Sequence, residues 1–291
     1  MIDTLCIIGV GLIGGSLARA LRDAGLVRRV VGCGRDPGNL ARAIELGVID
    51  HAESDPAKAV AGADMVVVAV TLGATQDILS RIAPALDPAA IVTDVGSAKA
   101  CVVAAARATL STAALPRFVP GHPIAGAEKS GVEASNARLF ERHRVILTPI
   151  PEQSPDALSR VTRMWEAAGA TVLNMDPDLH DQVLAATSHL PHLLAYAMVN
   201  CLLEMETPVD VFDYAAGGFR DFTRIASSNP PMWRDIALAN APALIAMCDR
   251  FERSLGSLRE ALERGDGSAL EAAFARAKQA RDDFMTRSGR A

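Results

Sequence analysis

The chain has 291 residues, of which 29 are basic and 34 are acidic, and its formal net charge is −5 at pH 7. The basic residues are not gathered into one stretch, which argues against a nucleic-acid partner, and the length predicts two domains. The N-terminus lacks a signal-peptide pattern, and polar residues interrupt the longest uncharged stretch, residues 183–203. We therefore expect a cytoplasmic protein that does not cross a membrane.

Residues 1–174 alternate short runs rich in β-branched residues with helical stretches. This alternation is typical of a parallel sheet covered by helices on both faces. Gly25 and Gly47 each follow a predicted helix, at the position where glycine commonly ends a helix. The predicted strands are residues 5–8, 29–32, 65–70, 91–94, 118–120, 145–148 and 171–173.

After about residue 175 the strand patterns stop, and long amphipathic patterns appear at residues 243–263 and 268–285. We expect an α/β protein with a dinucleotide-binding domain at residues 1–174 and an all-α substrate and dimerisation domain at residues 175–291. The second domain has more leucines than it can bury alone, which favours a homodimer through its helices.

The first predicted strand runs into Gly9, Gly11 and Gly14, spaced G-x-G-x-x-G, and a helix follows. Such glycines permit a tight turn, close approach of a pyrophosphate, and close packing of helix on strand. The helix N-terminus adds N–H donors and partial positive charge. The pattern predicts a Rossmann-like domain. The expected cofactor contacts are Gly9, Gly11, Leu12, Ile13, Gly14, Gly34, Arg35, Asp36 and Val70.

The end of the second strand indicates which dinucleotide is bound. An NAD-selective site usually has an acidic residue there for the ribose hydroxyls, but this chain has Gly34 followed by Arg35. Arg35 can pair with the 2′-phosphate of NADP, so we expect NADP. NAD is the alternative, in which Asp36 bends back to the ribose and Arg35 is only solvated.

Four stretches carry polar residues that apolar packing does not explain: 93–99, 121–131, 187–192 and 217–233. The first two follow predicted strands, at the edge where open α/β sheets bind ligands. We expect His122, in a rigid turn between Gly121 and Pro123, to take a hydroxyl proton as hydride leaves the same carbon. Ser97 either bonds that hydroxyl, orients the imidazole, or is an ordinary helix N-cap.

The other two stretches offer substrate contacts. Arg220 and Arg224 are four residues apart on one face of a predicted helix, where they form either a carboxylate site or a surface pair. His189 and His192 form H-x-x-H, but the intervening Pro191 and the lack of a clear third ligand make a metal site weaker than polar substrate contacts. We expect no metal.

In order and spacing, these motifs resemble those of the prephenate and arogenate (cyclohexadienyl) dehydrogenase family of tyrosine biosynthesis. The resemblance covers nearly the whole chain and rests on GVGLIGGS, GHPIAGAEKSG, TSHLPH and GGFRDFTRIASSNPPMWRDI. It implies oxidative decarboxylation of prephenate to 4-hydroxyphenylpyruvate, or of arogenate to tyrosine, with hydride transfer to NAD(P)⁺.

The resemblance also implies roles for single residues. His122 is similar to the family's catalytic histidine at the ring hydroxyl, Ser97 to its partner, and Arg224 to the arginine that binds a substrate carboxylate. Further matching pocket positions are His189, His192, Gly217, Trp233 and, near the entrance, Glu128.

Three alternatives remain beside prephenate. Arogenate, or use of both substrates, is one, because the two differ only in a side-chain keto or amino group near Arg220 or His189. A β-hydroxyacid dehydrogenase usually uses a lysine of its helical domain, and this chain has none between Lys129 and Lys278. A non-catalytic NADP sensor has no need of a catalytic histidine.

Overall fold

The computed structural model of the chain describes residues 1–126 and 129–287. The chain divides into two compact units, Met1–Ala241 and Pro242–Ala291. The strands are β1 Ile2–Ile8, β2 Val27–Cys33, β3 His51–Glu53, β4 Met65–Val68, β5 Ile91–Asp94, β6 Phe118–Val119, β7 Gly121–Ile124, β8 Arg144–Leu147 and β9 Thr171–Asn174. The α-helices are α1 Leu12–Asp23, α2 Pro37–Glu45, α3 Pro56–Ala59, α4 Leu72–Ile82, α5 Ala100–Thr109, α6 Pro155–Ala167, α7 Pro177–Leu184, α8 Leu190–Leu203, α9 Gly217–Thr223, α10 Pro230–Ala239, α11 Ala241–Glu263 and α12 Gly267–Arg287.

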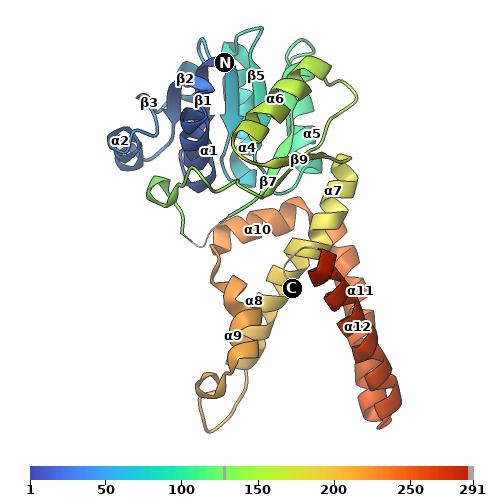
Figure 1. Ribbon diagram of the computed structural model, residues 1–291. Helices are drawn as coiled ribbons and strands as arrows, with labels where there is room; N and C mark the ends of the chain where they lie inside the picture. Colours follow the sequence, from blue (N-terminus) through green and yellow to red (C-terminus); the bar gives the residue numbers. More distant parts are fainter. Residues whose placement is uncertain (127–128, 288–291) are drawn as a thin grey trace. The chain divides into compact units, whose positions relative to one another are not determined.

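The first unit is built on a six-stranded sheet within residues 1–119, with the order β3-β2-β1-β4-β5-β6 (Figure 1). Its strand pairs are all parallel. This is the order of a Rossmann-like sheet, so the predicted α/β class is confirmed. The order reverses between β1 and β4, and sheets of this type bind ligands beyond the carboxyl ends of such strands.

Both faces of this sheet are buried because alternate residues of each strand enter different cores. Leu5 and Ile7 pack in a core that includes residues of α1, α2 and α6. Cys6 and Ile8 pack in a second core that includes residues of α3, α4 and α5. A strand covered on both faces is apolar along its whole length, which explains why β4 reads Met-Val-Val-Val.

The prediction of one sheet for all the strands was wrong. The strands β7, β8 and β9 form a second sheet in which β7 is antiparallel to β8. Only Pro120 separates β6 from β7, whereas a parallel neighbour requires a crossover of about a dozen residues. His122 therefore lies on a strand and not in a turn. Pro123 is tolerated there because β7 is an edge strand.

Two strands, β3 and β7, were missed by the sequence analysis. Their sequences, His-Ala-Glu and Gly-His-Pro-Ile, contain almost no β-branched residues. They form because neighbouring strands supply hydrogen-bond partners: β3 pairs with β2, and β7 with β8. Tertiary context thus overrides local propensity at both positions.

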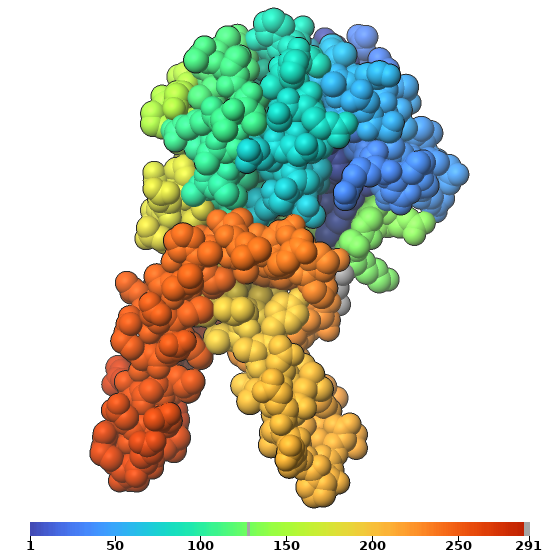
Figure 2. Space-filling model, turned by 180° about the vertical axis from the view of Figure 1, so that it is seen from behind, coloured from blue at the N-terminus to red at the C-terminus, as the bar shows by residue number. Residues whose placement is uncertain are grey.

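The rest of the first unit is helical. The helix α8 packs against α9, and α10 lies against α4, as the space-filling view shows (Figure 2). The second unit consists of α11 and α12 in its described part, and only Leu244 and Ala261 of these two helices are buried. Through residue 287, no described helix is long and apolar enough to cross a bilayer.

Candidate active site

The glycine-rich turn between β1 and α1 is sterically closed on one side. Gly9 has a φ of +102°, and a Cβ there would lie 2.2 Å from the carbonyl oxygen of Ala69. A Cβ at Gly14 would lie 2.4 Å from the carbonyl oxygen of Gly9. Glycine is therefore required at both positions, because any side chain would push α1 away from β1 and β4.

The same turn is open where a phosphate would approach. A Cβ at Gly11 would meet no atom within 4 Å. No side chain caps α1, so the first-turn amides of Leu12 and Ile13 have no acceptor within the helix. Val70 follows β4, and its nitrogen would lie 3.2 Å from a Cβ at Gly9. These predicted contacts lie together, and they fit a dinucleotide pyrophosphate.

The end of β2 carries the three residues expected at the ribose. Gly34 is half-buried and Arg35 is exposed. Asp36 is the N-cap of α2, and its Oδ1 accepts a hydrogen bond of 2.9 Å from the amide of Gly38. One oxygen of this carboxylate is therefore used to hold the start of α2.

A buried ion pair connects the two sheets. The Lys99 side chain is completely buried, and its Nζ donates to Oδ2 of Asp94 and, over 2.7 Å, to the carbonyl oxygen of Gly121. Asp94 also accepts hydrogen bonds from the amides of Gly96, at 2.7 Å, and Gly121, at 3.0 Å. Since Gly121 begins β7, the pair fixes the strand that carries His122 against the end of β5.

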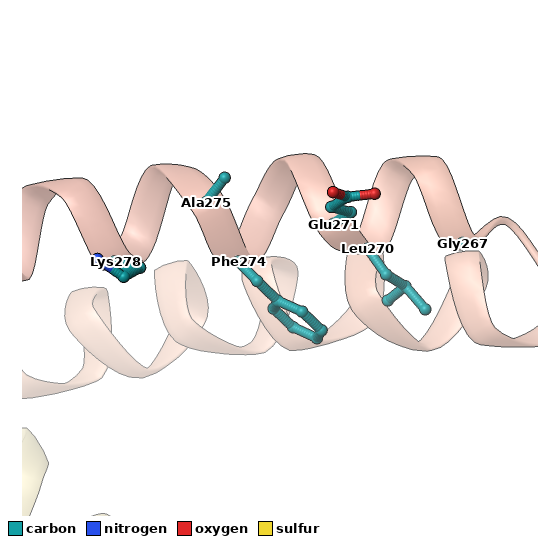
Figure 3. Close-up of a pocket in the computed structure, with 6 residues that line it drawn as sticks. All are labelled: Gly267, Leu270, Glu271, Phe274, Ala275 and Lys278. Carbon is teal, nitrogen blue, oxygen red and sulfur yellow. The ribbon is translucent and has the colours of Figure 1, made fainter.

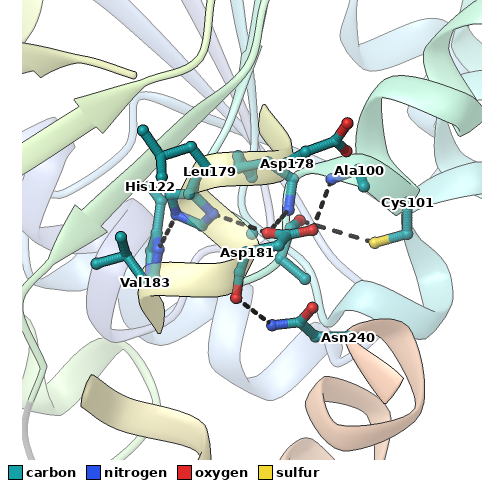
Figure 4. A network of polar contacts seen from close by, with 12 residues as sticks. Ala100, Cys101, His122, Asp178, Leu179, Asp181, Val183 and Asn240 are labelled. Atoms are coloured by element: carbon teal, nitrogen blue, oxygen red, sulfur yellow. Dashed lines mark hydrogen bonds and ion pairs between the residues drawn. The ribbon is translucent and has the colours of Figure 1, made fainter. Parts of the chain in front are cut away.

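His122 begins a chain of contacts into the protein interior (Figure 4). Its Nδ1 lies 2.9 Å from Nε2 of His180, and the Nδ1 of His180 lies 2.8 Å from Oδ1 of Asp181. Burial lowers the pKa of His122 well below its ordinary value, and the neighbouring basic groups His180, Lys99 and His189 lower it further. The imidazole of His122 is therefore neutral near pH 7.

The carboxylate of Asp181 also caps α5. It accepts hydrogen bonds from the amides of Lys99, at 2.7 Å, and Ala100, at 2.9 Å, while Asn240 Nδ2 donates to its backbone oxygen over 2.8 Å. Burial raises the pKa of Asp181, but the hydrogen bonds from His180 and the two amides outweigh it and lower the pKa. Because Lys99 occupies the N-cap position of α5, the ordinary cap role considered for Ser97 is wrong.

Two more predicted histidines lie beside the same network. A π-helical turn, Ala185–His189, ends at His189, whose Nδ1 is 3.0 Å from Nδ2 of Asn240. Burial lowers the pKa of His189 to about 4, and a hydrogen bond to the backbone of Ser97 opposes this shift. The ring of His192 stacks on Trp233, with centroids 3.5 Å apart. Ser97 and His189 are therefore brought together, as are His192 and Trp233.

Arg220 and Arg224 lie four residues apart at the end of a short helix, and the carboxylate site predicted for them stays a prediction. The helix α9 begins at Gly217 and ends at Thr223, and Arg224 begins a 3₁₀ turn. Both Arg220 and Arg224 are exposed. Burial lowers the pKa of His192, and the charge of Arg224 lowers it further, so this charge acts on the imidazole.

Two predictions about other groups remain. Glu128 lies outside the described residues. In the part of the chain that is described, no three His, Cys, Asp or Glu side chains are grouped so that they could hold a metal ion.

The sequence analysis missed five side chains of this site: Asp94, Lys99, His180, Asp181 and Asn240. The first two lie inside the polar stretch 93–99, so that stretch was a sufficient signal for them. His180 and Asp181 are adjacent and stand just after the predicted domain boundary, where they read as ordinary polar residues in the first turns of a helix. Only their burial in the folded structure marks these two residues as part of the site.

Comparison with known proteins gives a consistent result. Residues 17–174 match the family model described as "Prephenate dehydrogenase, nucleotide-binding domain", and residues 176–276 match "Prephenate dehydrogenase, dimerization domain". A cyclohexadienyl dehydrogenase of Zymomonas mobilis is 37% identical over 95% of this chain and 94% of that protein. A prephenate dehydrogenase of Bacillus subtilis is 36% identical over 99% of this chain and 77% of that protein.

A solved structure is similar over the whole fold. The prephenate dehydrogenase of A. aeolicus, crystallised with hydroxyphenyl propionate and NAD⁺, has a TM-score of 0.90 and 39% identity. The similarity covers 98% of each chain.

Replacing the buried cation is expected to destabilise the fold. The substitution Lys99→Met removes the partner of the Asp94 carboxylate, and we expect the free energy of unfolding to fall by about 3–5 kcal/mol. Denaturant unfolding measures this change. Lys58→Met, at an exposed position of α3, is the control and should change stability by less than about 0.5 kcal/mol. Equal stability of the two variants would contradict the structural role of the pair.

Proposed function

The chain belongs to the prephenate dehydrogenase family, and we propose that it oxidatively decarboxylates prephenate to 4-hydroxyphenylpyruvate. The observation that carries this proposal is the neutral, buried imidazole of His122 in one polar network at the carboxyl ends of the strands. A dehydrogenase that oxidises a hydroxyl needs such a base beside its dinucleotide site. The relative named as a cyclohexadienyl dehydrogenase makes arogenate the second candidate substrate.

The residues of the chain divide the reaction between them. The glycine-rich turn would hold the dinucleotide by its pyrophosphate, and the bound nicotinamide would supply the hydride acceptor for the carbon that bears the ring hydroxyl. His122 takes the hydroxyl proton as the ring carbonyl forms, and Ser97 bonds the same oxygen. The carbonyl withdraws electrons through the ring, so carbon dioxide leaves as the ring becomes aromatic. The protein mainly orients the ring and stabilises charge at one oxygen.

The remaining pocket residues serve to bind the substrate. The guanidinium of Arg224 offers paired donors to a carboxylate, and Arg220 is a second candidate for this contact. His192 and Trp233 form a flat, stacked surface, and the charge of Arg224 acts on His192. His189, Gly217 and Glu128 complete the proposed substrate-binding set.

Loss of the base should strongly slow turnover while cofactor binding remains. We expect His122→Asn to lower kcat by roughly 10²–10⁴-fold with prephenate, because proton removal then relies on water. Initial rates of reduced-cofactor formation, with prephenate or arogenate against NAD or NADP, measure this loss and identify the substrate. His143→Asn, at an exposed histidine, should retain full activity. A fully active His122→Asn variant would exclude this role.

The same base sets the pH dependence. His122 must be neutral to accept a proton, and its pKa lies well below 6.5, so the neutral form is lost only when the pH falls through that lowered value. We expect kcat/KM to stay high at pH 6.5 and to fall only at distinctly lower pH. A fall in kcat/KM that already begins at or above pH 6.5, and that persists when each of the other histidines is replaced, would contradict the lowered pKa of His122.

For the cofactor we propose NADP, with NAD as the alternative. Gly34 leaves no carboxylate to repel a 2′-phosphate, and exposed Arg35 is placed beside it. Asp36, the residue that could instead favour NAD, already caps α2. The A. aeolicus structure contains NAD⁺, which keeps NAD as the alternative for this chain.

A carboxylate at position 34 should reverse this preference. A Cβ at Gly34 would lie 3.4 Å from the nearest side-chain atom of Leu40, which is ordinary contact, so Gly34→Asp fits. We expect KM for NADP to rise at least about tenfold by charge repulsion, with KM for NAD falling. Arg35→Ala should raise KM for NADP only, whereas Arg28→Ala serves as the exposed control. An unchanged ratio of the two KM values in both variants would favour NAD as the natural cofactor.

We propose further that the chain forms a homodimer through its helices, with the functional boundary near residue 175. Residues 176–276 match a dimerization domain. Ile245, Leu255, Leu262 and Phe274 are exposed on α11 and α12. Leu270 and Phe274 project from one side of α12 beside an apolar groove (Figure 3). A face of this kind is typical of a surface covered by a second copy.

Charge on this face should weaken the dimer. We expect Leu262→Asp combined with Phe274→Asp to convert the dimer to monomer, because each carboxylate would be desolvated at the interface. Light scattering after size-exclusion chromatography measures the mass. Arg276→Asp is the control, since it lies about 200° around α12 from Phe274. A monomeric wild-type chain, or a dimeric double variant, would contradict the proposed interface.

A further inference from the structure

We infer that His180 and Asp181 are positioning residues that hold the proton of His122 on Nδ1 and leave its Nε2 to receive the substrate proton. The inference rests on the proposed role of His122 as the base. It assigns a function to His180 and Asp181, which have none in the proposed reaction. It comes from the direction in which each hydrogen bond of the network has to run.

The direction is set at Asp181. Its two oxygens accept hydrogen bonds from the amides of Lys99 and Ala100, which can only donate. A carboxylate with two such donors is ionised and acts only as an acceptor. The contact of 2.8 Å between Oδ1 and Nδ1 of His180 therefore requires the proton to be on His180 Nδ1.

The same logic passes through the next ring. In a neutral His180 with its proton on Nδ1, Nε2 has a lone pair and accepts. The contact of 2.9 Å to Nδ1 of His122 then needs its proton from His122. A neutral His122 that donates from Nδ1 has an unprotonated Nε2. A doubly protonated His180 would reverse this bond and place the proton of His122 on the wrong nitrogen.

The surroundings hold both rings in place. His180 is completely buried, and Asp181 is joined to α5 by its carboxylate and to Asn240 by its backbone oxygen. Figure 4 shows how His122 and Asn240 reach the Asp181 region from separate elements. Neither imidazole can turn over without breaking a buried hydrogen bond, which leaves a buried polar group without a partner.

Titratable groups from three elements face the imidazole of His122. Lys99, from the β5–α5 segment, disfavours a charged His122 before substrate arrives, and its own ion pair is with Asp94. His189, from the π-helical turn, is neutral near pH 7. The carboxylate of Asp181 lies in line with the imidazole of His122 and acts through His180. When His122 takes the substrate proton, its Nδ1–H remains bonded to a ring that Asp181 polarises, which stabilises the new positive charge.

The proton positions can be observed directly in the full-length protein. Long-range ¹H–¹⁵N correlation spectra report which nitrogen of each imidazole is protonated, and the chain has only six histidines to assign. We expect protonated Nδ1 and unprotonated Nε2 in both His122 and His180 at pH 7. A proton on Nε2 of His122, or a doubly protonated His180, would overturn the inference without affecting the substrate assignment.

Two substitutions of His180 test whether the hydrogen bond that it accepts from His122 matters, apart from the space that its ring fills. A glutamine places polar atoms near the former Nε2 and can still accept from His122, whereas an asparagine places them near the former Nδ1 and reaches only Asp181. We expect His180→Asn to lower kcat by roughly 10²-fold, with KM and cofactor affinity changed by less than about threefold. His180→Gln should lose clearly less, and His143→Gln should match the wild type.

The outcomes distinguish this inference from the proposed function. Equal losses of kcat in the two His180 variants, or activity within twofold of wild type in both, would overturn the positioning role of His180. Thermal unfolding and cofactor binding confirm that each variant is folded. If His122→Asn retains activity, or the wild type is inactive with both substrates, the proposed function fails instead, and the spectra still decide the proton positions.

Discussion

The structure depends on a positive charge that is entirely shielded from water. Lys99 is held by Asp94 and by the carbonyl oxygen of Gly121, and this contact is what keeps the edge strand β7 at the end of the parallel sheet. A buried charge is costly unless it is paired and hydrogen-bonded, and this pair joins the two ends of the loop from Asp94 to Lys99. Ser97 lies within this loop, and its position relative to His122 follows from the same constraint.

Asp181 supplies the second connection, between the helical segment and the parallel sheet. One carboxylate caps α5 and contacts His180, while Asn240 binds its backbone oxygen. A cap supplied by a residue distant in sequence couples folding to the geometry of the site: α5 and α7 must both be formed before His180 is placed. Stability and catalytic geometry therefore share the same hydrogen bonds.

The sequence predicted a position correctly where only one residue type can occupy it for a clear physical reason. Gly9 was predicted for a tight turn and Gly14 for close packing of helix on strand, and no other residue fits the backbone and contacts at these two positions. Prediction failed where the reason lies in distant partners. His122 was placed in a turn because Gly and Pro flank it, but pairing with β8 makes the segment a strand. His180 and Asp181 gave no local signal, since only the fold buries them.

The end of β2 and the network around His122 have no residue in common. Gly34 and Arg35 follow one strand of the parallel sheet, whereas His122 and His180 come from an edge strand and a later helix. Position 34 has room for a side chain, so a single mutation there can be accepted without strain. In evolutionary terms, the choice of dinucleotide can drift with the metabolic supply of a cell while the chemistry of the ring stays under separate selection.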